Sequence, residues 1–331
     1  MKLNVSEVPV LRRVSPFSRE EALTTLLSAM PAQKDTQPRT EKSAERNHTV
    51  GEGWRLDVFA DGSAAEFIDE QVSETARKGA QTRSAPLSHE KLESLAREYI
   101  SRVLGKIVTI DAGESLVPEF AATRAQGGVA PDGGSSISSV TGHRIIFTRE
   151  IAGLPVVGAG SKVTVTFTNE GAVESFRYDW PSYQRSDRVE SLVDASEILA
   201  RIQRIALTRV GERDDGDRRK PPVGDKPPLA LGGGAELQRL SCGYYDPGHA
   251  VQMQGGEIQP GCLYHVLHRR GEGDQITTAG YSGAVPAGKS FTTEKNWPET
   301  LLLTGERIPE AKPGGQAEPP TSVRPTPPRE K

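Results

Sequence analysis

The chain has 331 residues, enough for two domains of ordinary size, and a formal net charge of −3 that argues against a general nucleic-acid or anionic-membrane binder. Hydrophobic residues make up only 35% of the chain, and Gly and Pro together number 58 (34 + 24), so we expect about two thirds of it to be folded. Because no apolar run of about 18 residues is present, the sequence predicts no membrane span.

The predicted elements alternate between helices and antiparallel strands. In chain order they are a helix at 18–30, a mobile polar loop at 33–53, a hairpin at 54–68, a polar segment at 71–86, a helix at 88–104, a meander at 142–181, a connection at 183–190, a helix at 194–211, and strands at 237–245, 249–253, 262–268 and 275–281. Residues 212–235 are charged and rich in Pro and Gly, which predicts a flexible surface insertion.

Capping signals support the predicted helices. Ser18 with Glu21, and Asp194 with Glu197, form the patterns of a capping box at a helix start. Between residues 88 and 104 the apolar side chains fall on one face and the charged ones on the other, as in an amphipathic helix.

The stretch Gly142–Pro181 gives the strongest strand signal. Its extended runs are separated by Ala152-Gly153 and by two further breaks at 158–160 and 169–171. Residues 162–167 alternate between polar and apolar, which is typical of a strand with one buried face. Because no helix follows these glycines, they predict turns and bulges and not a phosphate-binding loop.

The element order predicts an α+β fold of tandem helix-on-antiparallel-sheet modules. We expect a partial α+β unit with flexible linkers at 1–86, a first module at 87–186 and a second, diverged module at 187–303 that carries the charged insertion. The Pro-rich tail at 304–331 cannot build a core and is predicted to be disordered.

No catalytic motif is present, whether a zinc-protease helix, a nucleophile elbow or a phosphate loop. Cys242, Cys262, His265 and His268 are spaced like zinc ligands, but alternation along a strand places His265 on the face opposite Cys262 and His268. The sequence therefore predicts no catalytic residue, no cofactor and no metal.

Cys242 and Cys262 are the two cysteines of the chain, 20 residues apart. On neighbouring strands they would form one disulfide, which implies an oxidising compartment. The alternative is a pair of buried thiols in a reduced cytoplasmic protein.

Trp180 and Tyr183 close the meander. They have two interpretations: packing under the sheet edge, which we favour, or an aromatic ledge for a bound peptide strand.

Part of the meander resembles the PepSY/thermolysin-propeptide (FTP-like) group. Its matching residues, within 151–177, are Gly153, Pro155, Val156, Gly158 and Gly171. These fit the group's order of a preceding helix, a G-ϕ-P-V-ϕ-G stretch, a strand, a Gly-containing turn and a returning strand. Residues 259–266 and 281–286 look like a second, diverged copy, so the resemblance covers about 88–290.

The resemblance implies cystatin-like modules that are usually extracytoplasmic and non-enzymatic, although the N-terminus predicts no signal peptide. We expect a protein or peptide partner, with a regulatory or protease-inhibitory role, and no nucleic acid. No protease domain follows, so a propeptide acting in cis is not expected. One alternative is an enzyme that assembles its site from dispersed residues such as His143, His265 or His268; another is a structural accessory subunit of a larger assembly.

Overall fold

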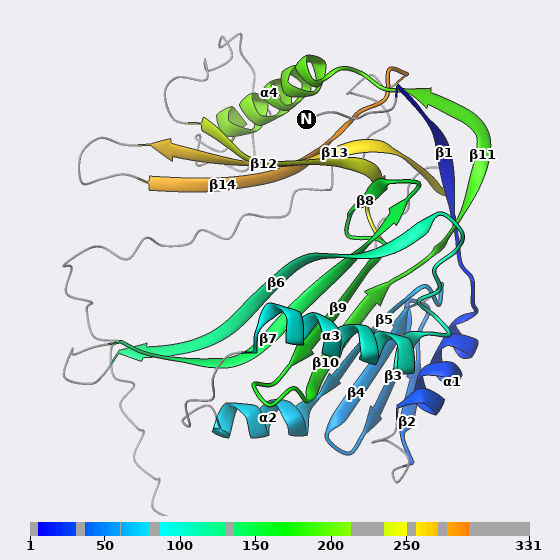
Figure 1. Cartoon of the computed structure of the whole chain (residues 1–331), viewed down its shortest axis with the longest axis vertical. Coiled ribbons are helices and arrows are strands. Elements are labelled where there is room, and N and C mark those ends of the chain that lie inside the picture. The colour runs from blue at the N-terminus through cyan, green and yellow to red at the C-terminus, as the bar shows by residue number, and fades with distance from the viewer. Residues whose placement is uncertain are drawn as a thin grey trace, which may run out of the picture.

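A computed structural model describes residues 6–30, 37–59, 61–79, 87–129, 136–212, 235–249, 256–270 and 277–290 (Figure 1). The predicted insertion at 212–235 lies outside these ranges except for its two end residues, and the predicted strand at 249–253 lies outside except for its first. The predicted disordered tail at 304–331 lies wholly outside them.

The described residues form 14 strands, four α-helices and one π-helical turn. The helical elements are α1 (Arg19–Ala29), α2 (Glu70–Gly79), α3 (His89–Tyr99), the π turn η2 (Ile100–Leu104) and α4 (Ala195–Glu212). The strands are β1 (Glu7–Val14), β2 (Arg39–Lys42), β3 (Arg46–Gly51), β4 (Trp54–Phe59), β5 (Ala64–Asp69), β6 (Glu114–Val129), β7 (Ser136–Ile151), β8 (Leu154–Gly158), β9 (Lys162–Phe167), β10 (Val173–Asp179), β11 (Ser182–Ser191), β12 (Ala235–Asp246), β13 (Glu257–Arg270) and β14 (Thr277–Pro286).

All 14 strands belong to one mixed sheet. Its hydrogen-bonded order is β11-β1-β13-β12-β8-β7-β9-β10-β5-β4-β3-β2, with β14 added beside β13 and β6 beside β7. Figure 1 shows α1, α2 and α3 across one face of the strands β3 to β10, and α4 beside β12, β13 and β14. The prediction of tandem helix-on-sheet α+β modules is therefore wrong, because the protein is mostly β and its strands form a single sheet.

Two strands connect the parts of this sheet: β1, which the sequence did not predict, and β8, which lies within the predicted meander. β1 pairs antiparallel with β11 along its length and with β13 at Leu11 and Arg12. β8 pairs in parallel with the end of β12 and antiparallel with β7. The segment 183–190, predicted as a connection, is most of β11. Its charged residues hide the alternation typical of a strand.

The predicted loop at 33–53 also contains strands, β2 and β3. Two inward-facing positions of β3 are the polar residues Asn47 and Thr49, both fully buried, so the apolar alternation that would reveal a strand is missing. α2 lies in the polar segment 71–86 and is capped by Asp69, whose carboxylate accepts a hydrogen bond from the N–H of Val72 at 2.8 Å. That cap is the sequence signal that could have revealed the helix.

The predicted helices and the meander are confirmed. Ser18 and Glu21 make both hydrogen bonds of a capping box at α1, and Asp194 accepts from the N–H of Glu197 at the start of α4. β7, β9 and β10 pair antiparallel in that order and form the meander, while β8 pairs with β7 beside them. Ala152 and Gly153, with φ of 50° and 81°, make the two-residue turn from β7 to β8 that pairs of positive φ favour. None of the described helices is long and apolar enough to cross a bilayer.

Candidate functional site

The most prominent polar feature is a buried group that we call the Arg13 cluster: Arg13, Ser63, Asp179, Asp246 and His249. Arg13, at the end of β1, donates to both carboxylate oxygens of Asp246 at 2.9 and 3.0 Å and to Asp179 at 2.6 Å. The side chains of Asp246 and Asp179 are 0% and 5% exposed. Both His249 Nδ1 and the His249 backbone N–H lie within hydrogen-bond distance of Asp179, at 2.9 and 2.7 Å. The cluster therefore joins the ends of three distant strands, β1, β10 and β12.

The two aromatic residues singled out in the sequence, Trp180 and Tyr183, lie beside this cluster. The guanidinium of Arg149 stacks over both rings, at 4.1 Å from the centroid of Trp180 and 5.1 Å from that of Tyr183. Trp180 is 1% exposed, and its indole N–H donates to the carbonyl of Thr109. The Tyr183 hydroxyl donates to Asp246 and accepts from Ser161. Trp180 is thus part of the core and presents no surface to a peptide in this conformation.

The electrostatics of the Arg13 cluster fit a structural role, in which its ion pairs hold the ends of β1, β10 and β12 together. Burial acts to raise the pKa of Asp179, but the hydrogen bonds from His249 and the charge of Arg13 outweigh it, so this pKa is lowered. Burial raises the pKa of Asp246 in spite of Arg13, because its carboxylate is completely enclosed. Each carboxylate already accepts hydrogen bonds from at least two residues of the protein itself.

The lowered pKa of Asp179 gives a test by pH. A carboxyl whose folded pKa is lowered contributes stability above its unfolded pKa, of about 3.9, and loses that contribution as the pH falls through the folded pKa. The destabilisation caused by Asp179→Asn should therefore be largest near neutral pH and should shrink toward about pH 3. Urea unfolding of both proteins at the two pH values measures this; an equal difference at both would contradict the assignment.

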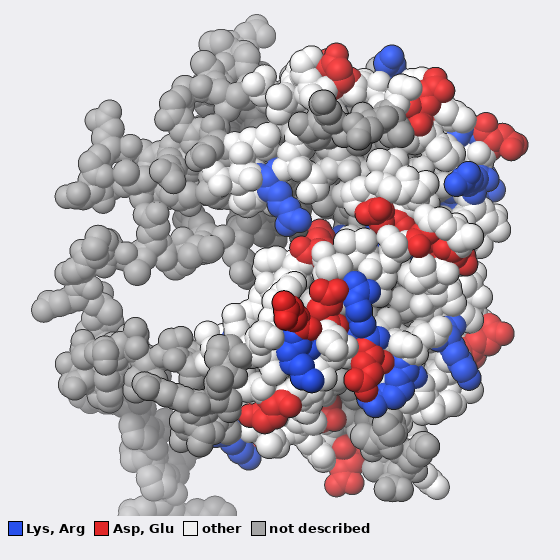
Figure 2. All heavy atoms as spheres, viewed as in Figure 1, with Lys and Arg blue, Asp and Glu red and all other residues white. Residues whose placement is uncertain are grey.

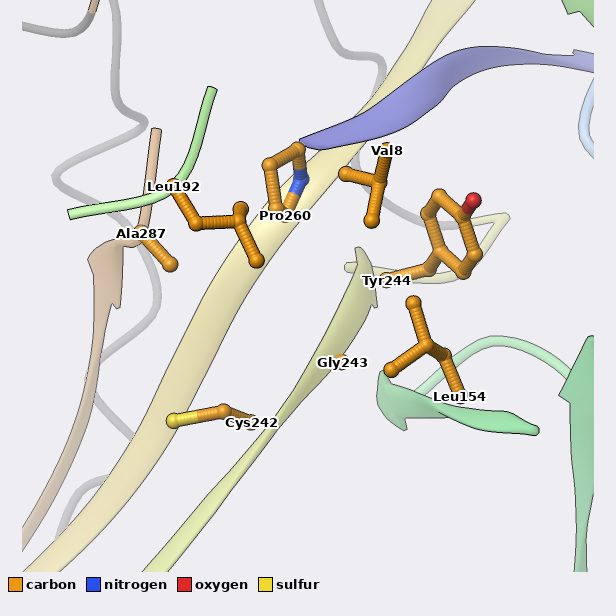
Figure 3. Close-up of a pocket in the computed structure, with 8 residues that line it drawn as sticks. All are labelled: Val8, Leu154, Leu192, Cys242, Gly243, Tyr244, Pro260 and Ala287. Carbon is orange, nitrogen blue, oxygen red and sulfur yellow. The ribbon is translucent and has the colours of Figure 1, made fainter. Parts of the chain in front are cut away.

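A small hollow in the described residues lies between β1, β8, β12 and β13, away from the Arg13 cluster, and has a volume of about 10 Å³ (Figure 3). That is the room of about one water molecule. Its lining is mostly apolar: Val8, Leu154, Leu192, Cys242, Gly243, Tyr244, Pro260 and Ala287. The part of the chain described here contains no group of three or more His, Cys, Asp or Glu side chains arranged to hold a metal.

Two of the histidines considered as catalytic candidates, His143 and His265, lie on different strands and contact different partners. His143 is buried on β7, where its Nε2 accepts from the N–H of Leu87 at 3.3 Å, and burial lowers its pKa. His265 lies on β13, and its Nδ1 is 2.8 Å from the Oγ of Ser282 on β14. The side chain of His268 lies outside the described residues. The structure brings His265 together with Ser282 and with no carboxylate that would orient it.

Cys242 and Cys262 lie directly opposite each other on β12 and β13 and form a disulfide. Cys262 packs under α4 with Ile198 and Ile202.

The margins of the sheet provide a different kind of site. β2, β6, β11 and β14 each have one edge that pairs with no described strand. Three of them carry the features that block pairing at an edge, which are charges or proline. β2 reads RTEK, β11 contains four charged residues, and β6 carries Pro118 and Glu119. β14 reads TTAGYSGAVP and has no charged residue in ten positions. Its single proline, Pro286, is its last residue, so residues 277–285 of this edge carry neither charge nor proline.

The register determines which main-chain groups of β14 face outward. The Cα atoms of Cys242 and Cys262 are 4.0 Å apart, the short spacing of an antiparallel pair that exchanges no main-chain hydrogen bonds. The N–H and C=O groups of Cys262 therefore point to β14, where its partner is Val285. Because the direction alternates along a strand, residues 279, 281 and 283 also face β13, and residues 278, 280, 282 and 284 face outward.

Contacts at the end of β14 agree with this assignment. The N–H of Ala287 donates to the carbonyl of Pro260, toward β13, at 2.9 Å. Arg201 of α4 donates to the outward carbonyls of Pro286 and Gly288, at 2.9 and 3.0 Å. The far end of the edge is thus closed by the protein itself. The four outward residues before it carry four N–H donors and four carbonyl acceptors, to which no described segment is paired.

Comparison with known proteins identifies no relative. Neither the protein-family models nor the curated protein sequences match this chain.

Proposed function

We propose that the protein is a non-enzymatic component that binds a protein or an extended peptide by strand addition to β14. In this mode main-chain hydrogen bonds supply affinity, and the side chains beside the edge supply selectivity. The observation that carries the proposal is the row of outward N–H and C=O groups on β14, a strand without charged residues. The other three edge strands, β2, β6 and β11, all carry charges.

The surface beside this edge suits a strand. Val285 packs under α4 on one face of β14, while Ala284 packs with Leu263 and Tyr245 on the other. At Gly283 a Cβ atom would lie 2.5 Å from the hydroxyl of Tyr264. An uncharged strand with an unpaired edge is a template for pairing with another chain.

An enzymatic role is less well supported. The Arg13 cluster contains an Asp–His pair, but both acids are bonded to Arg13, and the small hollow among the described residues lies elsewhere. On the face seen in Figure 2 acidic and basic side chains are interspersed, with no broad area of one sign to attract a polyanion or a polycation.

The proposal includes an extracytoplasmic location and a relation to the PepSY/thermolysin-propeptide group. The Cys242–Cys262 disulfide supports the location, because disulfides persist in oxidising compartments. The relation rests on the motif at 153–171 alone and does not extend to cystatin-like modules.

A matched pair of variants tests the binding site. Ser282→Pro removes one outward N–H and puts a ring in the path of an added strand, without removing a bond to β13. Ser282→Ala removes the hydroxyl that contacts His265 but keeps the N–H. Linear peptides selected from a displayed random library on the wild-type protein should bind Ser282→Pro at least about tenfold more weakly, and Ser282→Ala about as well as wild type.

Thermal unfolding of both variants checks that the sheet is intact. Selected peptides that bind Ser282→Pro at full affinity, or a library that yields no binder, would overturn the proposal.

A further inference from the structure

We propose that, without a partner, the β14 edge pairs with the β14 edge of a second copy, so that self-association occupies the binding site. This inference rests on the proposed function and adds a means of regulating it. A second copy of β14 suits this edge for two reasons. The strand has no charges that would repel its own copy, and its outward residues can pair with those of the copy.

Charge is the first argument. A twofold axis brings a strand against its own copy, so that charges of one sign near the axis face each other and repel. β11 carries Arg185, Asp187, Arg188 and Glu190, so an axis at residue 187 or 188 would place a charge against its own copy. β14 has none to oppose its copy.

Register is the second argument. Two antiparallel copies can exchange main-chain hydrogen bonds only between residues that face outward in both, which are 278, 280, 282 and 284. One alignment uses all of them: 278 opposite 284, and 280 opposite 282, with residue 281 of both copies opposite each other at the axis. Four pairs with two bonds each give about eight hydrogen bonds.

The closed end of the edge disfavours the neighbouring alignments. In the next alignment toward the C-terminus, one copy is moved by two residues and residue 278 lies opposite Pro286. Pro286 has no N–H, and its carbonyl is already bonded to Arg201. The carbonyl of Gly288, the next outward residue, is also bonded to Arg201. In the next alignment toward the N-terminus, residue 284 lies opposite a position before Thr277, the first residue of β14, and so loses its pairing partner.

Engineered cysteines test the register directly. Residue 281 meets its own copy in a pair without main-chain hydrogen bonds, the arrangement that already holds the Cys242–Cys262 disulfide. Under oxidised glutathione Tyr281→Cys should form an intermolecular disulfide, identified by mass spectrometry as a 281–281 cross-link. Ala279→Cys, on the same strand but opposite residue 283, should form it at least about tenfold less.

Two further measurements separate this inference from the proposed function. Sedimentation velocity of the wild type should show a concentration-dependent dimer, and Ser282→Pro should remain monomeric. The dimer cross-linked at residue 281 should lose binding of the library-selected peptides. A wild type that stays monomeric while those peptides bind would overturn the inference and leave the function standing, as would equal cross-linking of both cysteine variants. A cross-linked dimer that binds peptide normally would also overturn it.

Discussion

Replacing Arg13 by Met is expected to lower the free energy of unfolding by about 3–5 kcal/mol, the range seen when one partner of a buried ion pair is removed. Arg13 neutralises two carboxylates, Asp179 and Asp246, whose side chains are 5% and 0% exposed. Methionine fills similar space but leaves both acids without their cation. Urea unfolding near neutral pH measures the loss, because both carboxylates are then ionised in the unfolded chain.

Arg188 offers a matched control in the same part of the sheet. It pairs with Glu257 at 2.9 Å, but its side chain is 47% exposed and that of Glu257 25%. Arg188→Met should therefore cost no more than about 1 kcal/mol, as for surface ion pairs. Similar losses for the two variants would show that the Arg13 cluster is not the tie between β1, β10 and β12 that its geometry indicates.

Removing the disulfide by the paired changes Cys242→Ala and Cys262→Ala is expected to cost about 3 kcal/mol. The bond closes a loop with a sequence separation of 20 residues, and opening it restores conformational freedom to the unfolded chain. The cysteines also fix β12 against β13, the strand that positions β14. The midpoint of urea unfolding should fall accordingly.

Reduction of the disulfide in the wild-type protein provides the control for the double alanine variant. Dithiothreitol should destabilise the wild type and leave the alanine variant unchanged. If reduction does not shift the unfolding midpoint of the wild type, then the disulfide does not contribute to the stability of this sheet.

Local patterns in the sequence predicted local structure well. Capping residues such as Ser18 and Asp194 located helix starts, and the alternation at 162–167 located a strand. These signals depend on neighbours within one turn or one hairpin, so a single chain reveals them.

The arrangement of strands in space could not be predicted in the same way. β1 pairs with β11 and β13, which lie far along the chain, and β11 has an unremarkable polar sequence. Buried polar residues such as Asn47 concealed β3. The modular interpretation failed because β1, which was not predicted, pairs with both β11 and β13, and β8 pairs with β12.

The candidate sites were predicted unequally. The cysteine pair was recognised with its alternative open, and for Trp180 the favoured interpretation was packing, which its 1% exposure supports over the alternative of peptide binding. No local pattern links Arg13 to Asp179 and Asp246, which come from three distant strand ends. The uncharged run from 275 to 281 was predicted as a strand, but only the sheet order shows that it forms an edge.

Amide hydrogen exchange along β14 tests the central claim most directly. In the monomeric protein, residues 279, 281 and 283 should exchange slowly because their N–H groups bond to β13, and residues 278, 280, 282 and 284 should exchange fast. Addition of a library-selected peptide should slow the second set and leave the first unchanged. Slow exchange at all seven positions in the free monomer, or no change when the peptide binds, would contradict strand addition at this edge.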